Sequence, residues 1–267
     1  MVTPSPLGAT RLFLLLAFGL GAAGAVFGQS VLYFTDGDSS RLQAVNVTTG
    51  QLVFTATTSS LAYPIAVRDT IALGHRDSPG LTGQYNLTDG SLIGSTQAPL
   101  GTPNWSQTVD GAAAGNFNYT FAAFSNSTTV YRTDANWANA TVAFTLTGSD
   151  LVGITYDINT GNLWVSDTNT IYQYTTSGTL VSQFSKVSGR AALAYQSSTD
   201  TLWLVPNSSS SPLLQYSKSG TLLQSLTVGG RSGNVFGAEF QAIPEPSTCV
   251  LLGLGLGFVA WFCRRRG

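Results

Sequence analysis

Short apolar runs alternate with polar segments rich in Ser, Thr, Asn and Gly along the chain, and the pattern repeats. The repeat is clearest between residues 151 and 226, where Trp164 in one copy corresponds to Trp203 in the next. Within each copy, apolar and polar side chains alternate in four short runs, which is typical of β-strands. Four strands in roughly 40 residues are typical of one blade of a β-propeller.

Four strands are predicted in each of these two copies, and weaker copies precede them. The predicted strands of the two clear copies are 151–156, 161–167, 170–174 and 177–184, then 191–195, 200–204, 213–216 and 219–226. Those of the weaker copies are 63–67, 70–73, 83–87 and 89–93, then 107–109, 119–124, 129–132 and 140–146.

The two ends of this repeat region predict a closed ring. Segments 31–34, 42–45 and 50–54 match only the second, third and fourth strands of a repeat, and 235–240 aligns with the first strand at 151–156. The first and last segments therefore complete one blade, which removes an exposed sheet edge. The predicted fold class is all-β: a small propeller of five four-stranded blades, with one blade shared by both ends.

The clear copies also resemble a known repeat family. Gly161-Asn-Leu-Trp-Val-Ser-Asp167, an aromatic strand and Ser177-Gly-Thr-Leu180 are similar to NHL-type propeller repeats. The resemblance implies structural roles, so Trp164 and Trp203 are expected in the core between blades. Turns between the last two strands of a blade are expected at Thr49-Gly50, Asp89-Gly90, Ser177-Gly178 and Ser219-Gly220.

Apolar segments flank the repeats. Arg11 precedes an apolar run and then small residues through Gly28, which predicts a secretory signal peptide over 1–28 and export through the Sec translocon. The predicted propeller domain covers 29–242, and a third segment covers 243–267. In that segment, residues 247–263 are uncharged and would span about 25 Å as a helix, at the short end of a membrane span.

The C-terminal segment resembles a sorting signal. Pro244-Glu245-Pro246, a Leu/Gly-rich span and the cluster Arg264-Arg265-Arg266 occur in the order of a PEP-CTERM domain. That resemblance implies recognition by exosortase, a membrane-embedded enzyme, and a role at the cell envelope or in the extracellular matrix. The three arginines are expected to remain cytoplasmic by the positive-inside rule, with the propeller outside the cytoplasmic membrane.

Composition excludes several classes of function. Only 9% of residues are charged, and residues 29–243 hold eight basic against twelve acidic side chains, a net charge of −4. A mildly acidic domain without basic clusters does not fit nucleic-acid binding. Cys249 and Cys263 both lie in the C-terminal apolar stretch, so the propeller can form neither a disulfide nor a cysteine-based metal site.

Residues with catalytic or metal-binding chemistry are few. His75 is the only histidine, and with Asp77 it could form an acid–base pair. Asp36 and Asp38 are weak candidates for a calcium site, because no Glu closes their loop and Asp36 aligns with Asp167, a turn-capping position. No cofactor or metal site is therefore predicted.

The leading interpretation is an exported, exosortase-sorted surface or matrix protein whose propeller is not an enzyme. Exopolysaccharide and surface proteins are its candidate partners, and the membrane is a further one through the C-terminal helix before processing. One alternative is a hydrolase or lyase acting on extracellular polysaccharide, which would bring Asp36, His75, Asp77 and Asp167 around one pocket. Another is a lectin-like module with an equivalent aromatic and polar pocket in every blade. Fold alone decides none of these.

Overall fold

The structure, a computed structural model, describes residues 30–58, 61–75, 81–97, 108–124, 127–147 and 150–241. Twenty strands lie in these ranges. In chain order they are β1 (Val31–Asp36), β2 (Arg41–Asn46), β3 (Gln51–Thr57), β4 (Ala62–Val67), β5 (Ile71–His75), β6 (Leu81–Tyr85), β7 (Leu92–Gln97), β8 (Thr108–Ala114), β9 (Phe117–Phe124), β10 (Ser127–Asp134), β11 (Thr141–Thr147), β12 (Gly153–Asp157), β13 (Asn162–Ser166), β14 (Thr170–Tyr174), β15 (Leu180–Ser185), β16 (Ala191–Gln196), β17 (Thr201–Pro206), β18 (Leu213–Ser217), β19 (Leu222–Leu226) and β20 (Val235–Phe240).

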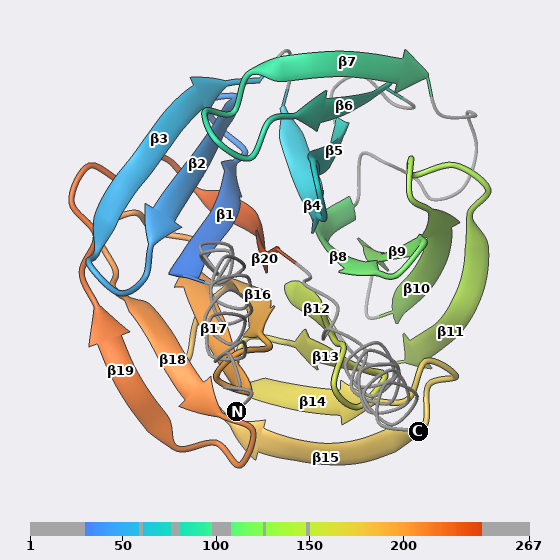
Figure 1. The fold of residues 1–267 in the computed structure, drawn as a ribbon. Helices are drawn as coiled ribbons and strands as arrows, with labels where there is room; N and C mark the ends of the chain where they lie inside the picture. Colours follow the sequence, from blue (N-terminus) through green and yellow to red (C-terminus); the bar gives the residue numbers. More distant parts are fainter. Residues whose placement is uncertain are drawn as a thin grey trace, which may run out of the picture.

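These strands form five antiparallel four-stranded sheets arranged as the blades of a ring (Figure 1). The sheet orders are β20-β1-β2-β3, β4-β5-β6-β7, β8-β9-β10-β11, β12-β13-β14-β15 and β16-β17-β18-β19. The first strand of each sheet lies near the centre of the ring, and the fourth lies at the circumference. The predicted five-bladed propeller is therefore confirmed.

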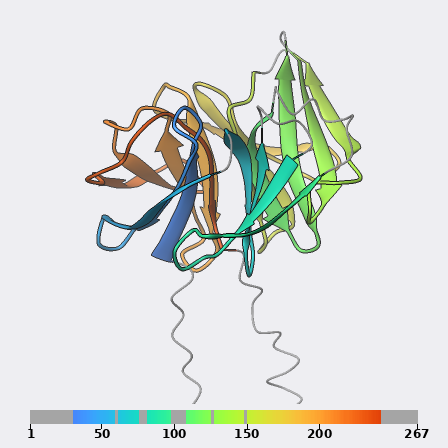
Figure 2. The same ribbon diagram turned by 90° about the horizontal axis from the view of Figure 1, so that it is seen from above.

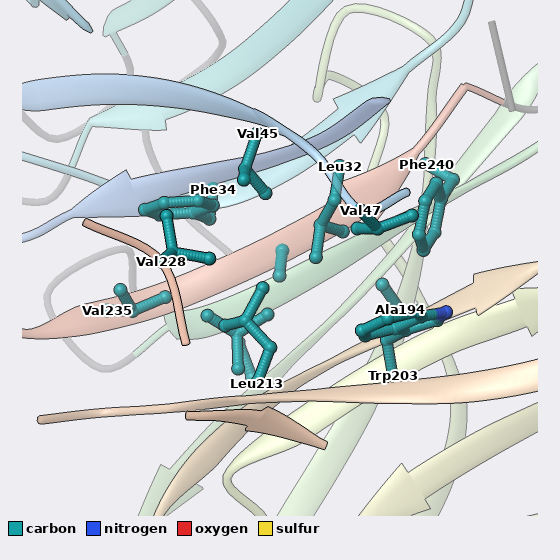
Figure 3. Close-up of a cluster of buried hydrophobic side chains, with 13 residues drawn as sticks. Leu32, Phe34, Val45, Val47, Ala194, Trp203, Leu213, Val228, Val235 and Phe240 are labelled. Carbon is teal, nitrogen blue, oxygen red and sulfur yellow. The ribbon is translucent and has the colours of Figure 1, made fainter. Parts of the chain in front are cut away.

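The blade shared by the two ends closes the ring, as predicted. β20 pairs with β1 in an antiparallel register that places Leu32 opposite Phe240. Figure 3 shows the apolar cluster behind this closure, where side chains of β1 and β20 pack against Trp203 and Leu213 of the preceding blade. β20 therefore covers the edge of β1 that would otherwise be unpaired.

The ring has two faces, and Figure 2 shows the strands running between them. Because β1 and β20 are antiparallel neighbours, the described ends Ser30 and Gln241 lie on the same face. We call it the terminal face; it also carries the turns that precede the fourth strand of each blade. The other side is called the opposite face.

The two repeated tryptophans lie in the core between blades, as predicted. Trp164 packs with residues of the following blade, including Leu193 and Tyr216, and Trp203 packs against Phe240. Each indole N–H has a partner in its own blade: Trp164 donates to Asp157 and Trp203 donates to Gln196. The repeat therefore encodes both the apolar contact and the hydrogen bond that the buried indole requires.

The four predicted turns are also confirmed. Their glycines have positive φ angles, and each lies one or two residues before the start of a fourth strand: Gly50 (71°), Gly90 (70°), Gly178 (87°) and Gly220 (90°). At Gly178 an added Cβ would lie 2.7 Å from Phe144 Cβ of the preceding blade. Any residue other than glycine at this position would therefore have a strained backbone and a Cβ that clashes with the neighbouring blade.

Several predicted strands have different bounds in the structure. Those predicted at 177–184 and 219–226 begin three residues later, at Leu180 and Leu222. The strand predicted at 89–93 begins at Leu92, because Asp89 and Gly90 belong to a turn in which the Ser91 N–H donates to Asp89. The strand predicted at 107–109 is β8, which begins at Thr108 and continues to Ala114. Asp110 lies within it and interrupts its apolar pattern.

The predicted signal peptide, membrane span and sorting motif lie outside the described residues. Within the described ranges, no helix has the length and apolar character needed to cross a bilayer.

Candidate functional site

Two carboxylates that the sequence analysis did not single out converge at the centre of the ring. Asp110 comes from β8 and Glu239 from β20, and their residues are 0% and 4% exposed. Inner strands have one unpaired edge facing the ring axis, and its N–H groups need acceptors because the residues there are buried.

Asp110 accepts four backbone hydrogen bonds. Its Oδ1 accepts from the N–H of Gly111 at 2.8 Å and of Ala238 at 3.1 Å. Its Oδ2 accepts from the N–H of Ile154 and of Leu193, both at 3.0 Å. One side chain therefore joins β8 to β12, β16 and β20.

Glu239 completes the set. Its Oε1 accepts from the Ala113 N–H at 2.5 Å, and its Oε2 accepts from the Val67 N–H at 2.6 Å. These bonds join β20 to β8 and β4, so the two carboxylates together connect all five inner strands. Threonines act similarly near them: Thr155 Oγ1 accepts from the Tyr195 N–H at 3.0 Å.

Burial raises the pKa of both central carboxyls above their ordinary values, and the backbone N–H groups oppose that shift. The charge of Asp110 raises the pKa of Glu239 further, whereas Arg68 lowers it. A carboxyl with raised pKa is a candidate for acid–base chemistry only where a substrate can reach it.

The two cavities described along the ring axis are small. One contacts Glu239 and Tyr195 on the terminal face, and the other contacts Val109 and Phe236 on the opposite face. Each has a volume of about 10 Å³, which is no more than one water molecule requires. The central carboxylates are thus bonded to backbone and enclosed, an arrangement that holds strands together.

A larger cavity of about 220 Å³ lies on the opposite face, beside β16. It is lined by two loops and the strands they join, with aliphatic side chains such as Val187, Leu204 and Leu214 and with Arg190 and Ser211. No aromatic side chain lines it. An equivalent aromatic pocket of the kind that a lectin-like blade would carry is therefore not formed at this position.

Two buried cations hold the loops around this cavity. Lys186 Nζ donates to the carbonyl oxygens of Gly189 at 2.7 Å and Thr168 at 2.9 Å, and burial lowers its pKa to about 8. Arg231 donates to the carbonyl oxygens of Ser211 and Pro206, and burial lowers its pKa to about 10. Both cations pair with carbonyl groups, so their evident role is to fix loop conformation.

A charged cluster on the terminal face joins two blades. Lys218 Nζ lies 3.1 Å from Asp157 Oδ2 and 2.5 Å from Asp200 Oδ1, and the Tyr195 hydroxyl donates to Asp200. Burial alone would lower the pKa of Lys218, but its bonds to the two carboxylates outweigh burial and raise that pKa. The cluster ties the turns of neighbouring blades.

Asp36 and Asp167, two of the candidate residues from the sequence, occupy separate turns. Asp36 Oδ1 accepts from the Asp38 N–H at 3.1 Å, and Asp167 Oδ1 accepts from the N–H of Asn169 and of Thr170 at 2.7 Å. Both aspartates therefore cap turns, in different blades. Of the remaining pair, Asp77 lies outside the described residues and only the backbone of His75 is described.

A calcium site at Asp36 and Asp38 gains no third acidic ligand. Asp38 Oδ2 accepts from the Asn234 amide, and Asp36 Oδ2 is buried without a hydrogen-bond partner among the described residues. Across the described ranges, no three His, Cys, Asp or Glu residues gather closely enough to hold a metal ion.

Comparison with known proteins identifies the C-terminal segment. Residues 242–266 match the PEP-CTERM protein-sorting motif, which contains the predicted Pro244-Glu245-Pro246 and Arg264-Arg265-Arg266. The motif implies an exported protein that exosortase processes. No curated protein matches the chain.

Solved structures support the fold alone. A functionally unknown protein from Desulfotomaculum acetoxidans is 12% identical, with a TM-score of 0.52 over 80% of this chain and 100% of that one. A chain of a nidogen/laminin complex is 11% identical, with a TM-score of 0.53 over 79% of this chain and 98% of that one.

Proposed function

We propose that this exported five-bladed propeller, which ends in a PEP-CTERM sorting motif, is a non-catalytic scaffold that exosortase delivers to the cell surface or the extracellular matrix. The observation that carries the proposal is the closed ring directly followed by the motif: β20 ends at Phe240 and the motif begins at residue 242. Cleavage near Pro244-Glu245-Pro246 would therefore release or transfer an intact propeller.

The centre of the ring supports the non-catalytic part of the proposal. A propeller hydrolase would need carboxylates that a substrate can reach from one mouth of the ring. Here Asp110 and Glu239 are enclosed, and six backbone N–H groups occupy their oxygens. Their chemistry is used to connect strands.

The test is the intact mass and location of the native protein in host cells with and without exosortase. The expected result is a loss of about 2 to 3 kDa, the size of the segment containing the membrane span, and surface display or release that depends on the enzyme. An unprocessed chain retained in the inner membrane of both strains would contradict the proposal.

A pair of variants makes the test specific to the motif. Replacing Glu245 by Ala should abolish processing, because it alters the tripeptide that defines the motif. Replacing Ser198, an exposed residue of a terminal-face turn, by Ala should leave processing unchanged. Equal processing of both variants would show that the tripeptide motif does not direct cleavage.

A further inference from the structure

The outermost strands of the five blades are uncharged. The five outer strands β3, β7, β11, β15 and β19 contain no Asp, Glu, Lys or Arg. We call these five strands the outer belt. Exposed edge strands in natural proteins are commonly protected by charged residues, above all Lys, or by Pro, because an open edge can pair with another chain. The outer belt has neither protection.

The outer belt also concentrates the exposed aliphatic side chains. Eight of the ten large hydrophobic residues described as exposed lie in it, with between 47% and 60% of their surface accessible. They are Val53, Leu92, Ile93, Val142, Leu180, Val181, Leu222 and Leu223. Every blade contributes at least one, so the apolar surface recurs around the whole circumference.

A β-bulge recurs beside these residues. In each blade the register between the third and fourth strands shifts near the start of the fourth, leaving one residue unpaired: Val53, Ile93, Ala143, Val181 or Leu223. Bulges redirect a side chain and limit pairing along an edge. Only three or four regular residues follow each bulge, as in Phe54–Thr57, so each edge can form only a short contact.

The inner and outer edges of the blades thus differ. Carboxylates and threonines satisfy the inner edges, whereas no strand of the described part covers the outer ones. We infer that the outer belt is a lateral binding surface for further copies of this chain. The contact would combine aliphatic side chains with short antiparallel pairing between outer strands.

A second copy fits the outer belt for two reasons. A strand edge is complementary to another edge of the same kind, and all five edges share one chemistry, so any blade can meet any blade of a neighbour. The domain has a net charge of −4, but this belt is uncharged, so copies can approach side by side without direct charge repulsion.

The inference deepens the proposed function. It rests on that function in one respect, because copies of the chain would meet at the membrane or cell surface to which the sorting motif delivers them. Only residues 242–246 separate the propeller from the predicted span, a reach of about 20 Å. Copies anchored in one membrane would therefore stand at similar heights and present their outer belts to each other. Five weak sides per molecule favour a multivalent layer over a single tight dimer.

Self-association of the purified full chain in detergent tests the inference, with sedimentation equilibrium as the measurement. The average mass should rise with concentration between about 1 μM and 1 mM, the range in which exposed edges associate. A variant with one lysine per outer strand should associate at least about tenfold more weakly. Its substitutions are Val53→Lys, Ile93→Lys, Val142→Lys, Val181→Lys and Leu223→Lys.

A second variant controls for added charge. It places one lysine per blade in exposed turns of the terminal face, and it should associate like the original chain. Its substitutions are Thr48→Lys, Thr88→Lys, Asn116→Lys, Thr160→Lys and Ser198→Lys. Both variants keep the same C-terminal segment, so any difference between them arises in the propeller.

The outcomes separate the two proposals. The inference would be overturned if the original chain were monomeric, or if both lysine variants weakened association equally. If the monomeric chain bound purified host exopolysaccharide through the outer belt, the outer belt would be a glycan-binding surface. The first of these measurements needs no variant, so misfolding of a variant cannot obscure it. Self-association without exosortase-dependent processing would overturn the proposed function and leave the outer belt as an assembly surface.

Discussion

At the scale of single residues, the ring depends on side chains that accept hydrogen bonds from strands in other blades. Asp110 alone receives N–H groups from four inner strands, including its own. An unmade bond of this kind is costly, because the N–H group stays buried without an acceptor. The stability of the whole ring is therefore sensitive to one atom change at its centre.

Replacing Asp110 by Asn tests this dependence. The amide nitrogen would face two N–H donors in place of a carboxylate oxygen, so two buried donors lose their acceptor. We expect the free energy of unfolding in urea to fall by about 2–5 kcal/mol. Asp69→Asn, at an exposed turn position, should change it by less than about 0.5 kcal/mol. An unchanged stability of the Asp110 variant would mean that the carboxyl is held protonated.

At the scale of elements, a turn glycine before the outer strand fixes how blades pack at the circumference in four of the five blades. The turn glycine of one blade contacts an outer-strand side chain of the preceding blade, as Gly178 contacts Phe144 and Gly220 contacts Phe184. The close approach and the positive φ angle both select glycine. Ser-Gly and Asp-Gly pairs were therefore informative in the sequence for the turn and for the neighbouring blade.

Two glycine substitutions separate strain from simple loss of flexibility. Gly178→Ala should lower the free energy of unfolding by about 1–3 kcal/mol, because φ is +87° and Phe144 blocks the new Cβ. Gly94→Ala should be neutral or slightly stabilising, since no atom lies within 4 Å of the new Cβ. Thermal unfolding followed by circular dichroism would measure both. Equal destabilisation would indicate that the contact with Phe144 has no energetic role.

The sequence predicted the blades better than it predicted the hydrogen bonds at the centre of the ring. Blade number and closure could be predicted because Trp164, Trp203 and their flanking strands repeat at a nearly constant interval. The start of β7 was predicted too early, since Asp89 caps a turn rather than continuing a strand. Turn residues with some strand propensity blur such boundaries.

The central carboxylates could not be predicted in the same way. Their partners are backbone N–H groups of strands up to 172 positions away, as for Glu239 and Val67. Every residue except proline has a backbone N–H group, so the pattern of side chains along the sequence does not indicate which N–H groups these carboxylates bind. The available signal was a single acid inside an otherwise apolar first strand, at Asp110 and at Glu239.

At the scale of the whole molecule, the last strand joins the ring in two ways. β20 pairs with β1 along its length, and it carries Glu239, which bonds to β4 and β8. Removing it would open the β20-β1-β2-β3 blade and leave N–H groups of two other blades without acceptors. The ring therefore behaves as one closed unit rather than as five independent repeats.

Two truncations examine this closure. A chain ending at Gln241 should unfold cooperatively with nearly the melting temperature of the full chain, because every described strand remains. A chain ending at Asn234 lacks β20 and should lose that transition, which calorimetry would detect. A cooperative transition in the shorter chain would show that the remaining four complete blades can stand without closure.

The position of β20 has a consequence for the order of events during synthesis. The strand that completes the first blade is made last, about 200 residues after its neighbour β1, and such distant pairing is slow to form. Until β20 emerges, β1 has an open edge, and a prematurely ended chain keeps that edge open. A chain can therefore close its ring only after translation has reached the end of β20, just before the sorting motif. Incomplete chains keep an open strand edge and stay accessible to proteases, so they are removed before they can join a surface layer.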